Sequence, residues 1–101
     1  MSKQQLREDI IHQLKVNPRL VERALVVLYE RQTLDEQMAG ETKHHNGIGF
    51  SAWAARWGSY YGRYVLSGKR LTGIHLDRAR DIAIKHVRQL VELALIKQRK
   101  L

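Results

Sequence analysis

Apolar residues recur with helical spacing near the start of this chain, in two segments separated by one strong break. The first segment, residues 3–15, carries a single apolar stripe and is preceded by Ser2, a candidate N-cap. The second, residues 18–31, has an apolar face broad enough to predict burial on two sides, as in the central helix of a bundle. Asn17 and Pro18 separate them, because proline disfavours helical geometry in the preceding residue and suits the first helical position.

The same periodicity predicts two more long helices in the second half of the chain. Residues 52–66 combine aromatic, basic and very small side chains, with Ser51 as the expected N-cap and Gly68 as the glycine that ends the helix. Residues 73–98 keep a helical apolar stripe throughout, with Thr72 as the expected N-cap, and are predicted to form one continuous helix.

Between these pairs of helices the pattern is weaker. Thr33 and Glu36 have the spacing of a capping box, which predicts a short helix near residues 34–40. Residues 41–50 are polar and glycine-containing, without the alternation of a strand. The sequence therefore predicts a compact all-α bundle of four main helices plus one short helix, forming a single domain over residues 1–101.

The helix over residues 52–66 has two contrasting faces when its residues are placed at about 100° intervals. Large rings gather on one face: Trp53, Trp57, Tyr60 and Tyr64. Nearly opposite lie the small residues: Ala54, Ala55, Gly58 and Gly62. Either the rings form the core and the small face allows another helix or a nucleic-acid backbone to come close, or the small face is internal and part of the ring face is exposed.

We expect the first arrangement for most of the rings, because an aromatic stripe at helical spacing is usually core. Trp53, Trp57 and Tyr64 are therefore interpreted as structural. The face carrying Gly58 and Gly62 marks a close contact of unknown kind, for which homo-oligomerisation is one hypothesis, because glycine inside a helix costs about 1 kcal/mol relative to alanine.

Charge is distributed unevenly along the chain. Residues 1–51 hold seven Lys/Arg and seven Asp/Glu, whereas residues 52–101 hold eleven against three, which accounts for the whole net charge of +8. Such asymmetry favours a polyanionic partner, most commonly nucleic acid. The alternative is a solvated basic face that only aids solubility.

Tyr60, flanked by Arg56 and Arg63, is the expected exposed part of the aromatic helix, because arginines are rarely buried unpaired. Arginine binds phosphate bidentately and tyrosine can stack on a base. The N-terminus of the last helix is a further candidate phosphate site, although an ordinary basic turn with an N-cap explains it equally well. The full candidate nucleic-acid-binding set is Arg56, Tyr60, Arg63, Lys69, Arg70, Thr72, Arg78, Lys85 and Arg88. Further loop contacts are expected at His44, His45, Asn46 and Gly47.

Catalysis, metal binding and cofactors are not expected from the residue pattern. The chain has no cysteine, and its five histidines lack metal-site spacing. No paired carboxylates, nucleophile elbow or nucleotide-binding fingerprint is evident. There is also no apolar run long enough to span a bilayer and no signal peptide at the start, which favours an intracellular, cytoplasmic protein.

A set of residues between positions 28 and 90 resembles a small module of phage and plasmid proteins. The residues are Leu28-Tyr29, Gln32-Thr33, Asp35-Glu36-Gln37, Thr42, Asn46-Gly47, Gly49-Phe50, Leu71-Thr72, Ala79-Arg80 and Gln89-Leu90. That module is associated with the ends of helicase-like proteins and with short stand-alone proteins of mobile elements. The resemblance implies nucleic-acid traffic or interference with host defence. The chain departs from the pattern at Ala54, where the resemblance implies an acidic residue, so a role that depended on that acid would not carry over.

Two functions are therefore expected. The first is a non-enzymatic nucleic-acid-binding protein of a phage or plasmid, using the basic and aromatic surface of its C-terminal half. The alternative is a protein-binding inhibitor or adaptor of a host nucleoprotein complex, similar to an anti-CRISPR protein, because Trp, Tyr and Arg also dominate protein-binding hot spots.

Overall fold

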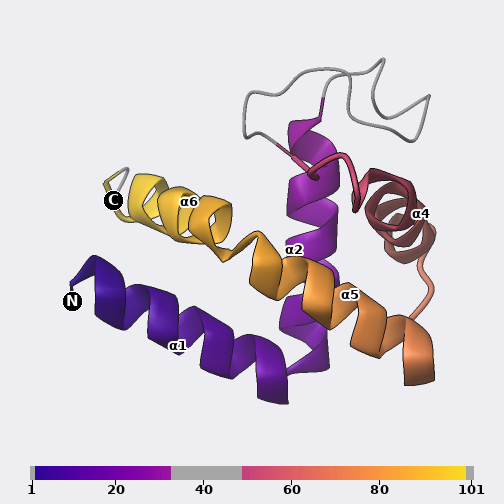
Figure 1. Cartoon of the computed structure of the whole chain (residues 1–101), viewed down its shortest axis with the longest axis horizontal. Helices are drawn as coiled ribbons and strands as arrows, with labels where there is room; N and C mark the ends of the chain where they lie inside the picture. Colours follow the sequence, from indigo (N-terminus) through magenta and orange to yellow (C-terminus); the bar gives the residue numbers. More distant parts are fainter. Residues whose placement is uncertain (1, 33–48, 100–101) are drawn as a thin grey trace.

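The computed structural model describes residues 2–32 and 49–99, and each regular element in these two stretches is an α-helix. The helices are α1 (Lys3–Val16), α2 (Pro18–Arg31), α4 (Ala55–Leu66), α5 (Gly73–Lys85) and α6 (Val87–Arg99), as Figure 1 shows. The predicted all-α class is confirmed for these stretches, although the last predicted helix is divided in two. The short helix predicted near residues 34–40 lies outside the described residues.

The first two helices begin where the sequence predicts. The Ser2 hydroxyl accepts a hydrogen bond from the Gln5 N–H at 3.1 Å, and the Gln5 side chain accepts one from the Ser2 N–H at 3.0 Å. This reciprocal capping box satisfies two backbone donors at the start of α1. At the start of α2, Asn17 accepts from the Arg19 N–H at 3.0 Å and Pro18 occupies the first helical position. Both boundary predictions are confirmed.

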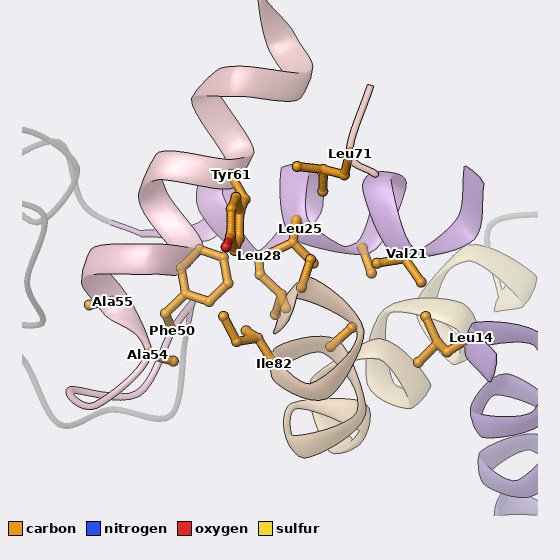
Figure 2. Packing of buried hydrophobic residues seen from close by; sticks show 13 residues of the cluster. Leu14, Val21, Leu25, Leu28, Phe50, Ala54, Ala55, Tyr61, Leu71 and Ile82 are labelled. Carbon is orange, nitrogen blue, oxygen red and sulfur yellow. The ribbon is translucent and has the colours of Figure 1, made fainter. Parts of the chain in front are cut away.

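Helix α2 is the centre of the bundle, in contact with α1, α4 and α5 (Figure 1). Its Val21, Leu25 and Leu28 are fully buried on one face, and Ala24 and Glu22 on either side of them are buried as well, so the broad buried face predicted for this helix is confirmed. Figure 2 shows these residues meeting side chains from the other helices and from the segments that join them. The main core cluster comprises Leu14, Val21, Ala24, Leu25, Leu28, Phe50, Ala54, Ala55, Tyr61, Leu71, Ala79, Ile82 and Ala83.

Helix α4 packs against α2 through its small residues. A Cβ atom added to Gly58 would lie 2.5 Å from the Phe50 ring, and one added to Gly62 would lie 2.6 Å from the Cβ of Tyr29. Neither position has room for a methyl group, so glycine is required for this approach. The close contact predicted for Gly58 and Gly62 is therefore made within the chain, with Phe50 and Tyr29, and needs no second copy of the chain.

The start of α4 differs from the prediction. Residues 52–54 form a turn, the helix begins at Ala55, and its N-cap position is Ala54 rather than Ser51. The Ser51 N–H instead donates a hydrogen bond at 3.0 Å to Nε2 of His86, which ties this segment to the far end of α5. The end of the helix is as predicted, because Gly68 takes φ +91°, a left-handed conformation that favours glycine.

The predicted helix over residues 73–98 is broken at His86, whose backbone leaves helical geometry at φ −108° and ψ 21°. Both nitrogens of the His86 ring have hydrogen-bond partners at this break. Its Nε2 accepts from Ser51, so the proton of the neutral ring lies on Nδ1, which donates to the Ile82 carbonyl at 2.7 Å. No proline or glycine marks the position, so the apolar periodicity passes through it unchanged.

The break allows the two halves to pack in different directions. Helix α5 packs on α2, whereas α6 lies alongside α1 (Figure 1). A second, smaller core cluster forms between α1 and α6 from Leu6, Val87 and Val91. A straight helix could not bury both halves of its stripe in these two places.

Two buried side chains fix the segments that flank α4. Gln89 of α6 accepts from the Gly49 N–H at 2.9 Å and donates to the Gly49 carbonyl at 2.6 Å. Glu22 of α2 accepts from the Leu71 N–H at 2.9 Å. Because these backbone groups are buried, removing either partner would leave an unpaired polar group, at a cost of about 1–3 kcal/mol. The position of α4 is thus fixed at both ends.

Replacing Gly58 by alanine tests the contact between α4 and Phe50. We predict that Gly58→Ala lowers the free energy of unfolding by about 1–3 kcal/mol, because the methyl group overlaps the ring. Helix propensity alone would favour alanine by about 1 kcal/mol, so the sign of the change isolates the contact. Urea unfolding measures the change in the free energy of unfolding. Arg56→Ala, exposed on the same helix, is the control and should change the value by less than about 0.5 kcal/mol; a Gly58→Ala protein more stable than its parent would contradict the packing.

His86 gives the protein a pH-dependent stability. Burial lowers the pKa of His86 from its ordinary value of 6.5, and the hydrogen bond to the Ile82 carbonyl partly opposes this shift. The unfolded chain therefore binds a proton at a higher pH than the folded chain does. The stabilisation is complete above about pH 6.5 and is lost as pH falls from there towards the lower folded pKa.

We predict that the free energy of unfolding falls as the pH drops below about 6.5 and that His86→Gln flattens this slope. Glutamine keeps an acceptor for the Ser51 N–H but does not titrate. Urea unfolding at a series of pH values measures the slope, with His12→Gln, exposed on α1, as the matched control. Equal slopes in the parent and in His86→Gln would show that His86 is not the titrating group.

Candidate nucleic-acid interface

Large aromatic rings face outward from α4 and from the turn that precedes it. The side chains of Trp53, Trp57 and Tyr60 are 59%, 42% and 47% exposed, and Tyr64 is half-buried. The expectation that Trp53 and Trp57 belong to the core is wrong, because the small residues of α4 and the fully buried Tyr61 fill the interior in their place. The exposure predicted for Tyr60 is confirmed. These four exposed or half-exposed rings are called the ring surface below.

Neighbouring rings on this surface contact one another. Tyr60 and Tyr64 are stacked with ring centroids 6.0 Å apart, and Trp57 meets Tyr60 edge-on at 6.1 Å. Trp57 also stacks on the buried Tyr61 at 5.6 Å. Such aromatic pairs stabilise one another by about 0.5–1.5 kcal/mol beyond the area that they bury. The rings are therefore held in defined positions although they face solvent.

A basic side chain lies over three of the four rings. The Lys85 Nζ lies 5.0 Å from the Trp53 ring centroid, and the Lys69 Nζ lies 5.2 Å from that of Tyr64. The guanidinium carbon of Arg78 lies 4.2 Å from the Trp57 ring centroid. These cation–π contacts contribute about 0.5–1 kcal/mol each at exposed sites. They bring three of the predicted basic residues onto the ring surface, from α5 and from the segment that precedes it.

Arg78 is also part of a polar network beneath the rings. It donates at 3.2 Å to the hydroxyl of Tyr61, which lies 3.1 Å from Nδ1 of His75. Since the hydroxyl already accepts from Arg78, its own hydrogen can point to His75. The fully buried Tyr61 thus has its polar end paired. Arg78 therefore supports the fold as well as carrying charge.

Two other predicted residues, Arg56 and Arg63, are exposed on α4 itself. Lys69 and Thr72 are exposed in the segment before α5. Thr72 occupies the N-cap position of α5 as predicted, and its side chain makes no capping hydrogen bond. The side chains that would meet a polyanion here are thus accessible to it.

Arg70 and Arg88 are engaged in ion pairs. Arg70 lies 3.2 Å from the buried carboxylate of Glu22, so it helps to satisfy a buried charge. Arg88 lies 3.7 Å from Glu92 on the exposed face of α6. Exposed pairs of this kind contribute little to stability, so Arg88 remains available to another anion.

A hollow of about 80 Å³ lies beside the ring surface at the start of α5. It is smaller than the roughly 300–1,000 Å³ of typical small-molecule sites, so it does not define a metabolite pocket. Its lining residues are Tyr60, Tyr61, Tyr64, Arg70, Leu71, Thr72 and His75.

A larger groove of about 650 Å³ separates the start of α1 from the junction of α5 and α6. Lys3 and Arg7 of α1 line one side, and Lys85 and Arg88 line the other, with Glu92 as the acidic member. The charge pattern of the sequence does not predict this arrangement, because it treats the two halves of the chain separately. Lys85 belongs both to this groove and to the ring surface.

The remaining predicted sites are not placed. His44, His45, Asn46 and Gly47 lie outside the described residues. Over residues 2–32 and 49–99, no group of three or more His, Asp or Glu side chains is placed to hold a metal ion. In the same part of the chain, no helix is both long and apolar enough to cross a membrane.

Comparison with protein-family models, with curated proteins and with solved structures finds no match for this chain. Its function is therefore inferred from the residues and their geometry.

Proposed function

We propose that this protein binds nucleic acid, without catalysing a reaction on it, through the ring surface and the basic side chains around it. The observation that carries the proposal is the placement of Lys85, Arg78 and Lys69 within 4.2–5.2 Å of three exposed or half-exposed rings. Cations attract the phosphates and aromatic rings stack on bases, and nucleic acid offers both chemical groups on one chain.

Two further arginines extend the cationic part of this surface. Arg56 and Arg63 are exposed on the same helix as the rings, and arginine binds phosphate with two parallel hydrogen bonds. The proposal that the protein comes from a phage or plasmid is supported by the sequence resemblance described above, and it is independent of the surface chemistry.

We predict that Arg56→Glu combined with Arg63→Glu weakens binding to a mixed-sequence oligonucleotide by at least about tenfold at roughly 50 mM salt, where phosphate binding is strongest. The slope of log affinity against log salt should also become shallower, by about 0.7–0.9 for each phosphate that the variant no longer neutralises. Fluorescence anisotropy of a labelled oligonucleotide measures both quantities.

The matched control is Lys15→Glu combined with Lys97→Glu, on α1 and α6. It changes the net charge by the same amount at two exposed positions away from the ring surface. If the two double variants weaken affinity equally, binding depends on net charge alone. If the parent protein shows no binding at low salt, the proposed function is wrong.

The second candidate, a protein that binds and inhibits a host nucleoprotein complex, is favoured by the exposure of Trp53, Trp57 and Tyr60. Exposed Trp, Tyr and Arg residues dominate protein-binding hot spots. Capture of partners from host lysate, with and without nuclease, separates the two candidates. Partners retained after nuclease treatment would favour the inhibitor, and partners released by it would favour direct nucleic-acid binding.

A further inference from the structure

We infer that the nucleic acid bound at the ring surface is single-stranded, with unpaired bases stacked on Trp53 and Tyr60. This inference rests on the proposed function and names its ligand class. It assigns a binding role to Trp53, which lies outside the candidate set derived from the sequence.

The exposure of the rings is the first feature that favours a single strand. Trp53, Trp57 and Tyr60 are between 42% and 59% exposed, which leaves a large apolar area in water. In a duplex the faces of the bases are covered by their neighbours, and only base edges and phosphates are accessible. Basic residues alone would suffice to bind a duplex. Exposed rings find a matching apolar partner in the faces of unpaired bases.

The second feature is that the rings are held in position before a ligand arrives. Trp53 contacts the ring of His86, with centroids 6.0 Å apart, and the ammonium of Lys85 lies 5.0 Å from its centroid. Tyr60 is stacked on Tyr64, with ring centroids 6.0 Å apart. A ring that is already ordered gives up less conformational entropy on binding, so more of the stacking free energy appears as affinity.

The third feature is that the helices are poorly suited to enter a duplex groove. A helix that reads the major groove presents polar and basic side chains to base edges and phosphates. Helix α4 presents rings between its arginines, and α5 carries exposed carboxylates at Asp77 and Asp81. Asp77 is paired with Arg80 at 3.1 Å, whereas Asp81 would repel the phosphates of a duplex lying along α5. A flexible single strand can follow the rings and avoid it.

The test compares one strand with its own duplex. The labelled strand is a mixed-sequence oligonucleotide of about 20 nucleotides, longer than the ~4–16 nucleotides that typical single-strand modules cover. Affinity is measured by anisotropy at roughly 50 mM salt for the strand alone and for the strand annealed to its complement. We expect the single strand to bind at least about tenfold more tightly and to quench the tryptophan fluorescence, because one stacked base contributes roughly that factor.

Variants of Trp53 separate stacking from charge. Trp53→Ala should weaken single-strand binding by about 5- to 100-fold and leave duplex binding unchanged, whereas Trp53→Phe, which keeps a ring, should retain most of the affinity. Arg56→Glu should weaken binding to both ligands. Thermal unfolding checks that each variant is folded. If Trp53→Ala does not fold, Tyr60→Ala gives a second measurement of stacking.

The outcomes are distinct for the two proposals. Binding to neither ligand overturns the proposed function itself. Binding to strand and duplex with equal affinity, or equal weakening for both ligands in Trp53→Ala, overturns the single-strand inference and leaves nucleic-acid binding in place. A duplex bound more tightly than its strand would overturn it as well.

Discussion

The close approach of α4 to α2 is the constraint on which the rest of this molecule depends. Gly58 and Gly62 let the ring of Phe50 and the side chain of Tyr29 lie where any Cβ would intrude. Once the small residues of α4 face inward, helical geometry directs Trp57 and Tyr60 outward on the opposite side. The exposed rings are therefore a direct consequence of the contact that forms the core.

The break between α5 and α6 is the second feature that positions the residues around α4. His86 interrupts it and accepts the Ser51 N–H, and Gln89 holds both backbone groups of Gly49. These hydrogen bonds place Phe50, which lies between the two held residues, against Gly58. They also bring Lys85, the residue before the break, over the ring of Trp53. A straight helix could not both pack on α1 and hold the segment around Phe50, because its C-terminal part would continue away from α1 and from that segment.

Sequence reasoning predicts the helices well where local chemistry determines them. Ser2, Asn17 and Pro18 place the starts of α1 and α2 because capping and proline geometry act within a few residues. The break at His86 is not predicted, because the residue that its ring bonds there, Ser51, lies thirty-five positions away in the chain. The apolar periodicity of the sequence does not indicate such a distant hydrogen-bond partner.

The predicted orientation of α4 is wrong for a different physical reason. Periodicity divides a helix into faces but does not say which face points inward, and the size of the rings favours burial of Trp53 and Trp57. The two glycines are the better signal, since their cost within a helix must be offset by close packing. The grouping of Lys3 and Arg7 with Lys85 and Arg88 has no local signal, because it depends on α1 lying beside α6.

The placement of the cations bears on how one small surface can serve both stability and binding. Exposing an aromatic ring to water costs free energy, and a cation over the face of the ring offsets part of that cost without burying the ring. The same cation stays close to solvent, where a phosphate can reach it. Lys85 and Lys69 are exposed and can turn from ring to phosphate, whereas Arg78 is held by the Tyr61 hydroxyl and stays over Trp57. Fixed and mobile charges thus alternate along the rings, an arrangement suited to a flexible polyanion whose bases and phosphates also alternate.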